Sequence, residues 1–529
     1  MDKSTKKKTG SYYTPKTVVE FMIDYLGYDS DCRLTVLEPS AGDGRFLECL
    51  RKNNSRIAID AIEIDDEKAK TLSHKYRDTS RVRIVNQDFL QFAQDEKNES
   101  YDLIIGNPPY INKKNMTRES LELLSWMVGN NSLSKSLCQN IWVGFILGAV
   151  KLVKKSGAIF FVLPFEFLQV NYAEALRCWL EDRFNTIHVL VFEKRMFPEI
   201  EQETCLVYMS NRMGCRPTIL YRKYSDLSAS SLVRESSIVR NKPLKKWSNA
   251  ILNDDEIEIL EKRYSNFKTV YSFGECSPGV VTAANNELIL TKEEYLELKA
   301  AKFVKPIISK SSYLQNDVEI NYELIDKLDL LQKKVYLLDL KHETNLPESL
   351  EEYLNCVGNK MRNGKKIKDS YKCSRRNPWY GVPLTQVGDV CFFKRYDRFP
   401  RLCLNSSKIL TTDIAYNLRV DEEYDPKSVV FSFYNSFTLA LCEFHCRYYG
   451  GGVAELTPKE FAALKIPYRK INKEQWKFFA DLMHNGAQVQ EIVQYVDPIV
   501  LNDWSQKELE QLREIWKKLK HRRSNKRLK

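Results

Sequence analysis

The chain lacks an apolar run long enough to cross a membrane. Its longest such run, AIFFVLPFEFL beginning at Ala158, is far shorter than the roughly 20 residues that a spanning helix needs, and Pro164 and Glu166 interrupt it. The first ten residues, MDKSTKKKTG, hold no apolar core of the kind that a secretory leader has. We therefore expect a soluble, cytoplasmic protein.

The sequence also lacks the cysteine spacing of a disulfide framework or a metal site. Its 13 cysteines are scattered without paired spacing, which is typical of reduced thiols in the cytosol. The nearest approach to a ligand cluster is Cys442, His445 and Cys446, and no second pair of ligands lies near them in the sequence. We interpret these three residues as packing groups and expect no bound metal.

Acidic residues are fewer than basic ones, so the 529 residues carry a formal net charge of +11. The positive excess clusters in the first eight residues, in the segment 362–376 and in the tail 517–529. Any one of these clusters is equally well explained by a solvated surface or a frayed end. Together they favour a polyanionic partner such as nucleic acid.

Short apolar runs alternate with amphipathic segments between residue 33 and about residue 210. This alternation is typical of a parallel β-sheet with helices on both faces. The runs 186–192 and 203–210 come last and are candidates to close the sheet edge. From 211 to 255 the composition turns polar, and the segment SDLSASSLVRESSIVRNKP predicts a linker or an excursion at a domain boundary.

Two helices are predicted in more detail. The segment 141–154 has one apolar stripe, and Gly157 follows it where a helix stop is expected. The stripe consists of Ile141, Phe145, Ala149 and Leu152. The segment SQKELEQLREIWKKLK begins with Ser505 and Glu508 in the spacing of a capping box, and its opposite face is basic. Its apolar stripe consists of Leu509, Leu512, Trp516 and Leu519.

A glycine-rich turn, VLEPSAGDG, follows the first predicted strand, which ends at Glu38. Ser40, Gly42 and Gly44 are small enough to let backbone N–H groups approach a ligand closely. The turn has no Lys-Ser/Thr pair of the kind that cradles a phosphate, and Asp43 would repel a pyrophosphate. By itself such a turn is a weak signal, but its composition favours a cationic cofactor over a nucleotide phosphate.

Two acidic residues downstream strengthen this interpretation. Glu63 stands nineteen positions after Gly44, at the end of the next apolar run, where a carboxylate can accept hydrogen bonds from both hydroxyls of a ribose. Asp88, in NQDFL, follows a strand and can accept a hydrogen bond from an adenine amino group, while Phe89 packs against the ring. The two residues predict a nucleoside-binding pocket.

The most specific motif is DLIIGNPPYI, in which a buried strand delivers Asn107, Pro108, Pro109 and Tyr110 to the carboxyl edge of the sheet. The amino nitrogen of adenine is a poor nucleophile, because its lone pair is delocalised into the ring. The Asn107 amide oxygen and the Pro108 carbonyl can each accept one amino hydrogen and direct the lone pair at a methyl donor. The prolines fix the backbone, and Tyr110 offers a flat face for an extruded base.

These motifs, in this order, resemble those of the gamma group of N6-adenine DNA methyltransferases of type II restriction-modification systems. The resemblance extends to TGSYYTPKTVVEFM (9–22), which is similar to the leading motif of that family, and it is strongest over residues 9–210. In RMFPEIEQETCLVYM it points to Phe197 as an aromatic residue packed on the flipped adenine. The segments 278–288 and 446–458 are similar to parts of the family's recognition domains.

The resemblance implies S-adenosyl-L-methionine as cofactor, duplex DNA as substrate and a separate cognate restriction endonuclease as functional partner. It implies a Rossmann-like α/β methyltransferase domain, a mixed α/β target-recognition domain and C-terminal helices, over 1–250, 251–470 and 471–529. The expected cofactor-binding residues are Tyr13, Thr14, Glu38, Ser40, Gly42, Glu63, Asp88 and Phe89. The expected catalytic residues are Asn107, Pro108 and Tyr110, with Tyr110 and Phe197 stacking on the base.

DNA-binding residues are expected after residue 250. The segment YKCSRRNPWYG places Arg375 and Arg376 beside Trp379, a combination suited to phosphates or guanine edges. In CRYYGGGVAELTP, Arg447 and Tyr449 stand beside three glycines that permit close approach to a nucleic-acid backbone, although a packing turn explains them nearly as well.

Three alternatives remain at this stage. The motif also suits methyl transfer to a protein glutamine amide, but the long basic, aromatic region after it favours a duplex. A fused restriction and modification enzyme is a second alternative, for which the sequence offers no convincing nuclease carboxylates. A non-catalytic DNA-binding specificity protein is the third, and the intact Asn-Pro-Pro-Tyr motif opposes it. The sequence does not predict the recognition site, the oligomeric state or the residues that read bases.

Overall fold

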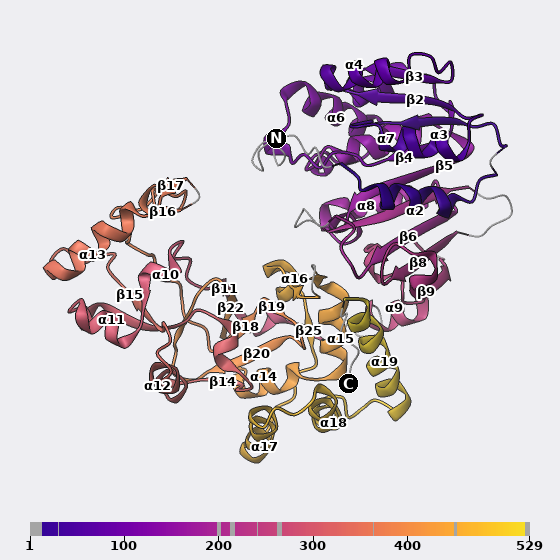
Figure 1. Cartoon of the computed structure of the whole chain (residues 1–529). Coiled ribbons are helices and arrows are strands. Elements are labelled where there is room, and N and C mark those ends of the chain that lie inside the picture. Colours follow the sequence, from indigo (N-terminus) through magenta and orange to yellow (C-terminus); the bar gives the residue numbers. More distant parts are fainter. Residues whose placement is uncertain are drawn as a thin grey trace. The chain divides into compact units, whose positions relative to one another are not determined.

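The computed structural model describes residues 13–29, 31–197, 203–211, 217–240, 242–261, 267–362, 364–448 and 452–523. The chain divides into two compact units, unit 1 (Met1–Ile257) and unit 2 (Glu258–Lys529), coloured indigo to magenta and magenta to yellow in Figure 1. The division lies close to the boundary expected after residue 250, and residues 471–523 are part of unit 2. Within the described residues, no helix is long and apolar enough to span a membrane.

Unit 1 is built on one nine-stranded sheet of order β3-β2-β1-β4-β5-β7-β6-β8-β9. Strands β1 to β5 are parallel to one another, and β7 lies antiparallel between β5 and β6. The strands are β1 (Thr35–Glu38), β2 (Ala58–Glu63), β3 (Val82–Asn86), β4 (Tyr101–Gly106), β5 (Val153–Pro164), β6 (Thr186–Phe192), β7 (Thr204–Ser210), β8 (Thr218–Tyr224) and β9 (Leu232–Val239). This order confirms the predicted Rossmann-like α/β class.

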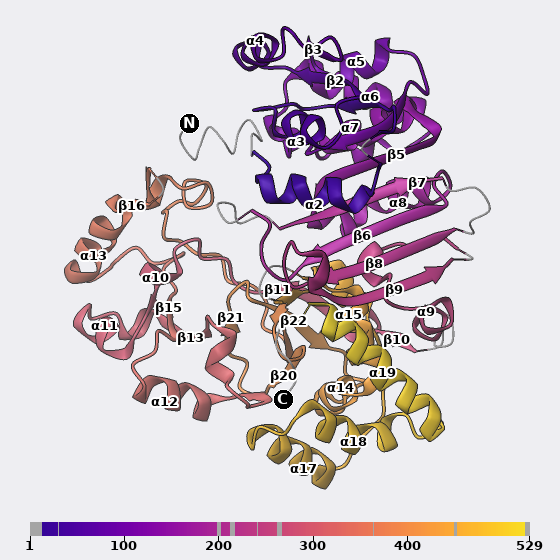
Figure 2. The same ribbon diagram turned by 45° about the vertical axis from the view of Figure 1, so that its right-hand side comes forward.

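Helices cover both faces of this sheet. Helices α2 and α3 pack together on one face, and α5, α6 and α7 pack together on the other (Figure 2). The helices of unit 1 are α2 (Lys16–Leu26), α3 (Arg45–Asn53), α4 (Asp66–Lys75), α5 (Phe89–Asp95), α6 (Arg118–Asn130), α7 (Trp142–Leu152) and α8 (Glu174–Glu181), and α9 (Asp254–Glu261) follows at its end. The apolar faces of α2 and α3 close one hydrophobic core against β1, β2 and β4.

The predicted end of the helix at Gly157 is wrong. Helix α7 ends at Leu152 and β5 begins at the next residue, so that Gly157 lies inside a strand. A Cβ atom at this position would lie 2.9 Å from the carbonyl oxygen of Asp102. The pairing of β4 with β5 also shifts register here, between Tyr101 and Leu103. The glycine therefore permits a close backbone approach at a β-bulge rather than a helix stop.

The prediction of a polar linker after residue 211 is also wrong for much of its length. Residues 218–224 and 232–239 form β8, parallel to β6, and β9, antiparallel to β8. Exposed and half-buried residues alternate along most of β9, which lies at the edge of the sheet. An edge strand with solvent on its outer side accommodates serine and charged residues, so its composition resembles that of a loop. The runs 186–192 and 203–210 consequently lie inside the sheet and do not close it.

Unit 2 contains two small mixed sheets and several two-residue ladders. The five-stranded sheet consists of β11 (Gly274–Pro278), β22 (Ala415–Val420), β18 (Val390–Phe393), β20 (Arg401–Asn405) and β14 (Glu319–Ile320). The four-stranded sheet consists of β12 (Ile289–Leu290), β15 (Tyr336–Leu338), β13 (Val304–Ile308) and β21 (Leu410–Thr411). The short ladders are β10 (Lys268–Thr269) with β25 (Lys465–Ile466), β16 (Met361–Arg362) with β17 (Lys365–Lys366), and β19 (Arg395–Tyr396) with β24 (Ala454–Glu455) and β23 (Arg447–Tyr448).

Helices of unit 2 surround these sheets. They are α10 (Asn285–Leu288), α11 (Lys292–Glu297), α12 (Tyr322–Leu330), α13 (Glu348–Asn359), α14 (Pro426–Phe433), α15 (Ser436–His445), α16 (Pro458–Ala462), α17 (Lys473–His484), α18 (Val489–Val500) and α19 (Gln506–Arg523). The predicted capping box at the start of α19 is confirmed: the Ser505 N–H and hydroxyl each donate to the Glu508 carboxylate at 2.8 Å. The predicted apolar stripe of α19 is buried as well.

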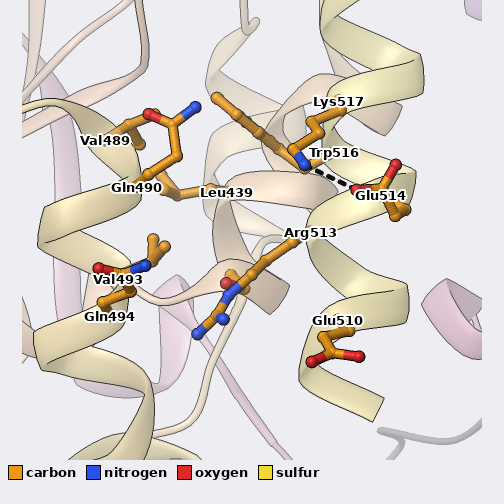
Figure 3. A pocket seen from close by; sticks show the side chains of 11 residues that line it. Leu439, Val489, Gln490, Val493, Gln494, Glu510, Arg513, Glu514, Trp516 and Lys517 are labelled. Carbon is orange, nitrogen blue, oxygen red and sulfur yellow. Dashed lines mark hydrogen bonds and ion pairs between the residues drawn. The ribbon is translucent and has the colours of Figure 1, made fainter. Parts of the chain in front are cut away.

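A buried carboxylate connects α15, α18 and α19. Asp497 accepts hydrogen bonds from the backbone N–H of Ser436 at 2.8 Å, from its hydroxyl at 2.7 Å and from Arg513 at 2.8 Å. Beside it, a depression with about 750 Å³ of empty space, part of it open to solvent, lies between the three helices (Figure 3). Its lining includes Leu439, Val493 and Trp516, together with polar residues of α18 and α19, and none of the functional residues expected from the sequence.

Glu181, at the end of α8, connects this helix to the segment after β9. Its carboxylate accepts hydrogen bonds from the indole Nε1 of Trp247 at 2.6 Å and from the backbone N–H of Leu244 at 3.0 and 3.2 Å. Burial raises the pKa of Glu181 from its ordinary value of 4.5 to about 7. Folded unit 1 therefore retains a proton on this carboxyl group in a pH range where the unfolded chain has released it.

We predict that Glu181 lowers the stability of unit 1 as the pH rises from about 5 to about 8. The pKa of this carboxyl group is higher in the folded state than in the unfolded state. Its contribution to the free energy of unfolding is therefore complete below the unfolded-state pKa and is lost as the pH rises through the folded-state pKa. At about 1.4 kcal/mol per pKa unit, the loss is roughly 3 kcal/mol. Thermal denaturation at several pH values should show a flatter profile for Glu181→Gln, and parallel profiles for variant and wild type would contradict the prediction.

Candidate active site

A cavity in unit 1 lies at the carboxyl ends of four neighbouring parallel strands, β3, β2, β1 and β4. It holds about 820 Å³ of empty space, part of which is open to solvent. Seven of the functional residues expected from the sequence line it: Tyr13, Ser40, Gly42, Glu63, Asp88, Phe89 and Asn107. The carboxyl edge of an open parallel sheet is the usual place for a ligand in this architecture.

The glycine-rich turn after β1 is closed by a carboxylate of β2. The backbone N–H of Gly42 donates to Glu63 Oε2 at 2.7 Å, and the N–H of Asp65 donates to Glu63 Oε1 at 2.9 Å. Gly42 and Gly44 have φ angles of 56° and 79°, in the left-handed region that favours glycine. Each oxygen of the buried Glu63 carboxylate retains acceptor capacity beyond these bonds.

Tyr13 lies over the turn, and Thr14 lies behind it. A Cβ atom on Gly42 would be 3.5 Å from the Tyr13 ring, which is also approached by Arg45 and Lys68 at 5.8 and 5.5 Å from its centroid. The Thr14 carbonyl accepts a hydrogen bond from Arg45 at 2.9 Å. Thr14 is buried and does not line the cavity, so the geometry gives it a supporting position beneath Tyr13.

Glu38 ends β1 and is almost completely buried, with 1% of its surface exposed. Burial, together with the negative charges of Asp43 and Glu63, raises the pKa of Glu38 well above its ordinary value. Its Oε2 atom has no hydrogen-bond partner among the residues that the structure describes. Glu38 therefore lies beneath the turn, outside the cavity lining, where a nearby cation or a hydrogen-bond donor would stabilise it.

Asp88 and Phe89 mark the start of α5 after β3. Asp88 caps the helix by accepting a hydrogen bond from the Leu90 N–H at 2.7 Å, and its other oxygen accepts one from the Ser120 hydroxyl at 3.5 Å. The Phe89 ring stacks on Phe145 with 4.8 Å between the centroids. Both residues line the cavity, but most of the Phe89 ring is packed inside unit 1, with 3% of the residue exposed.

The Asn-Pro-Pro-Tyr segment follows β4 directly. The Ser40 hydroxyl donates to the Asn107 carbonyl at 3.0 Å and so joins this segment to the glycine-rich turn. The Tyr110 hydroxyl donates to the Val162 carbonyl at 3.2 Å, which fixes the ring against β5. Pro108 is buried, and Pro109 lines the cavity in its place. Tyr110 is buried, with 9% of its surface exposed, and it does not line the cavity, so its stacking on a base stays a prediction.

Phe197 is not brought to the cavity. It is 6% exposed and belongs to the hydrophobic core that includes Val162, Leu190 and Leu206. The segment that follows it, 198–202, lies outside the described residues. In this structure, Phe197 packs as an ordinary core residue, and its stacking on a base stays a prediction.

Two of the three DNA-binding residues expected in 375–379 serve the fold. Arg376 donates to the carbonyls of Thr282 and Val281 at 2.7 and 2.6 Å. The Trp379 ring packs against the core, and a Cβ atom on Gly358 would lie 3.0 Å from it. The prediction that both contact DNA directly is therefore not supported by their positions. Arg375 is exposed and stacks on the Tyr371 ring at 3.9 Å.

The second expected DNA-binding pair is only partly described. Arg447 is half-buried and pairs with Glu460 at 3.5 Å. Tyr449 lies outside the described residues, as does the rest of 449–451. Cys442, in the neighbouring helix α15, and Cys446, which follows this helix, are buried. Among the described residues, no group of three or more histidine, cysteine, aspartate or glutamate side chains is arranged to hold a metal ion.

Three cations in the described part of the basic tail are buried rather than solvated. Lys520, Arg522 and Arg523 are 7%, 3% and 3% exposed. Arg523 forms a bidentate ion pair with the buried Glu443 at 2.6 and 2.7 Å and also donates to the carbonyl of Gly452. The interpretation of this cluster as a free basic surface is wrong for Lys520, Arg522 and Arg523, which are buried, and the Glu443 carboxylate neutralises the charge of Arg523.

Several cavity residues had no signal in the sequence that would assign them to a binding site. Lys68, Ser120 and Phe145 line the cavity from α4, α6 and α7. Helix α6 contributes Ser120 from its first turn, three residues after its N-cap Thr117. No motif marks these positions, because packing of the helices against the sheet brings them to the cavity.

Two protein-family models match the chain. The Eco57I restriction-modification methylase family matches residues 35–197, and the C-terminal domain of type II methyltransferase M.Eco57I matches residues 244–501. Type II methyltransferase M.AccI of Acinetobacter calcoaceticus is 22% identical over 95% of both chains. Type II methyltransferase M.HincII of Haemophilus influenzae is 30% identical over 37% of this chain and 36% of its own.

Solved structures share the fold. The type IIL restriction-modification enzyme MmeI in complex with DNA is similar with a TM-score of 0.56 and 13% identity, over 99% of this chain and 80% of that chain. The two family matches fall on the cavity-bearing part of unit 1 and on most of unit 2. Over both matched regions the chain is similar to type II restriction-modification methyltransferases, and these matches support a DNA methyltransferase.

We predict that the Arg523–Glu443 pair stabilises unit 2 and that Arg523→Ala destabilises it by about 3–5 kcal/mol, because a buried carboxylate is left without its partner. The matched control is Lys517→Ala, whose pair with Glu514 is half-exposed. This control should change stability by about 0.5 kcal/mol or less. Chemical denaturation followed by tryptophan fluorescence measures both, and equal effects of the two substitutions would contradict the prediction.

Proposed function

We propose that this chain transfers the methyl group of S-adenosyl-L-methionine to the N6 amino group of adenine within a short duplex sequence, and so protects DNA from a cognate restriction endonuclease. The observation that carries the proposal is the meeting of four strand ends at one cavity. The glycine-rich turn, Glu63 and Asp88 belong to three of these ends, and Asn107 belongs to the fourth.

The chemistry of the cavity suits S-adenosyl-L-methionine. Glu63 offers carboxylate oxygens for the ribose hydroxyls, and Asp88 offers one for the adenine amino group. A cation bound near the turn would favour the ionised form of the buried Glu38, whose pKa is raised well above its ordinary value, and the cofactor's sulfonium is such a cation. When bound, the cofactor supplies an electrophilic methyl group on a sulfonium. Tyr13, stacked near Gly42, would cover its methionine part.

Asn107 and Pro108 would hold the target amino group. The Asn107 amide oxygen and the Pro108 carbonyl each accept one amino hydrogen, which directs the nitrogen lone pair toward the methyl donor. The bond from Ser40 to the Asn107 carbonyl restrains this segment relative to the cofactor turn. A strong base is not needed, because positioning rather than deprotonation raises the reactivity of the nitrogen.

A base inside a duplex cannot reach this cavity, so the proposal requires the adenine to be extruded from the stack. Tyr110, with its hydroxyl fixed on Val162, offers a restrained ring face for the extruded base. Phe197 is the second proposed stacking residue, and it would have to leave the core to reach the base. Duplex binding itself is assigned to unit 2.

The direct test is mass spectrometry of nucleosides from duplex DNA incubated with the chain and labelled S-adenosyl-L-methionine. Label in N6-methyladenine is expected. Label in methylcytosine, or in a glutamine of a protein substrate included in the reaction, would contradict the proposal. Sequencing of the modified DNA gives the recognition site. Incubation of supercoiled plasmid with magnesium tests whether the same chain also cleaves DNA.

We predict that Asn107→Ala lowers the rate of methyl transfer by about 10²- to 10³-fold, the effect of removing one preorganised hydrogen-bonding group. The matched control is Asn115→Ala, because Asn115 is exposed and lies outside the cavity lining. Single-turnover rates with saturating DNA and cofactor measure the effect. Binding of DNA and of cofactor should be unchanged in both variants, and full activity of Asn107→Ala would rule out the proposed role.

We predict that Glu63→Gln weakens cofactor binding by about 10- to 100-fold, because a hydrogen bond to a charged group is worth about 1.5–3 kcal/mol. The amide nitrogen of glutamine accepts no hydrogen bond, so one of the two carboxylate positions would lose its acceptor for a backbone N–H and for a ribose hydroxyl. Glu67→Gln is the control, since Glu67 is exposed in the first turn of α4. Calorimetric titration with S-adenosylhomocysteine measures both variants, and equal affinities would argue against the assigned pocket.

A further inference from the structure

A two-stranded hairpin, β16–β17, protrudes from unit 2 beside α13 (Figure 1). Met361 pairs with Lys366, and Arg362 pairs with Lys365. All four residues are exposed, Met361 to 66%. A Cβ atom on Gly364, at the turn, would meet no atom within 4 Å. Gly364 is therefore free of the surrounding described residues.

The base of the hairpin is firmly attached. Arg362 donates two hydrogen bonds to the Glu287 carboxylate at 2.7 Å and one to the Ala283 carbonyl at 3.2 Å. The backbone N–H of Ile367 donates to the Lys360 carbonyl at 3.0 Å, and the Ile367 side chain is buried in the core. These contacts hold the hairpin in one position, so its charges are presented at low cost in conformational entropy.

Positive charge around the hairpin is not neutralised. Within the described residues, six cationic side chains of this segment form no ion pair: Lys360, Lys365, Lys366, Lys368, Lys372 and Arg375. Asp369 is the one carboxylate in the segment 360–376. This surface fits a partner with closely spaced negative charges, and a nucleic-acid backbone carries one charge per phosphate.

The free side chains of the hairpin favour phosphate contact over base recognition. Arginine reads guanine edges with two parallel N–H groups, but Arg362 uses its donors on Glu287 and Ala283. Lys365 and Lys366 remain, and a lysine ammonium is a point charge suited to phosphates. Arg376 of the following segment donates to two backbone carbonyls, and Trp379 packs against the core. The exposed lysines and Arg375 are the cations that remain here for a partner.

We infer that the hairpin 361–366 anchors unit 2 to the phosphate backbone of the DNA, with Lys365 and Lys366 making the contacts. This inference rests on the proposed function, since it requires duplex DNA as substrate. The contribution is independent of base sequence. It would hold the recognition unit on the duplex while other residues read the bases.

The test compares Lys365→Ala/Lys366→Ala with the control Lys473→Ala/Lys477→Ala in the full chain. Both pairs are exposed, and in both views α17, which carries the control pair, lies at the opposite end of unit 2 from the hairpin (Figure 2). Binding is measured by fluorescence anisotropy at several salt concentrations. One labelled duplex contains the sequence that the wild-type chain methylates, and a second lacks it.

Each phosphate contact contributes about 0.9 to the slope of log affinity against log salt concentration. The hairpin variant should therefore show a slope about 1.8 less negative than that of the wild type, and its affinity should fall by the same factor for both duplexes. The control should keep the wild-type slope. Melting temperatures should be unchanged in both variants, because the Lys365 and Lys366 side chains form no ion pair within the described residues and alanine preserves the backbone pairing of the hairpin.

Each other outcome overturns the inference. If the hairpin variant keeps the wild-type slope while the wild type methylates DNA, the inference fails and the proposed function stands. An affinity loss confined to the methylated sequence would assign the hairpin to base recognition, and an equal change in the control would indicate a general charge effect. If the wild type transfers no methyl group to DNA, the proposed function itself fails.

Discussion

Two hydrogen bonds made by the glycine-rich turn hold the cavity of unit 1 together. The Gly42 N–H donates to Glu63 at 2.7 Å, and the Ser40 hydroxyl donates to the Asn107 carbonyl at 3.0 Å. The first joins the ends of β1 and β2, and the second joins the ends of β1 and β4. Productive methyl transfer requires the reacting atoms to approach within about 3–3.5 Å, so the relative position of these strand ends decides whether the residues of the cavity can act together.

Three residues of this cavity were predictable from the sequence because each stands directly at the end of a strand. Glu63, Asp88 and Asn107 end or follow apolar runs, and parallel strands bring such positions to one edge. Lys68 and Ser120 were not predictable, because only the packing of α4 and α6 brings them there. The pairing of β8 and β9 was missed as well, since the outer side of an edge strand has the composition of a loop.

Unit 2 was harder to predict for two physical reasons. Strands as short as β12 and β21, with two residues each, contain too little periodicity to be recognised. The sequence also does not tell whether a charged side chain is exposed or neutralised inside the fold. Arg523 pairs with Glu443, 80 positions earlier, and Arg376 turns inward to two backbone carbonyls. The lysines of the neighbouring hairpin, in contrast, have no partner within the described residues.

Strands β8 and β9 extend the sheet on the side away from the cavity. These strands lie at the end of the sheet opposite to β3, and β5, β7 and β6 stand between them and the strand ends that form the cavity. A substitution at the outer edge is therefore separated from the cavity by three hydrogen-bonded strands. We expect changes of length or composition in β8 and β9 to affect methyl transfer less than changes at the ends of β1 to β4.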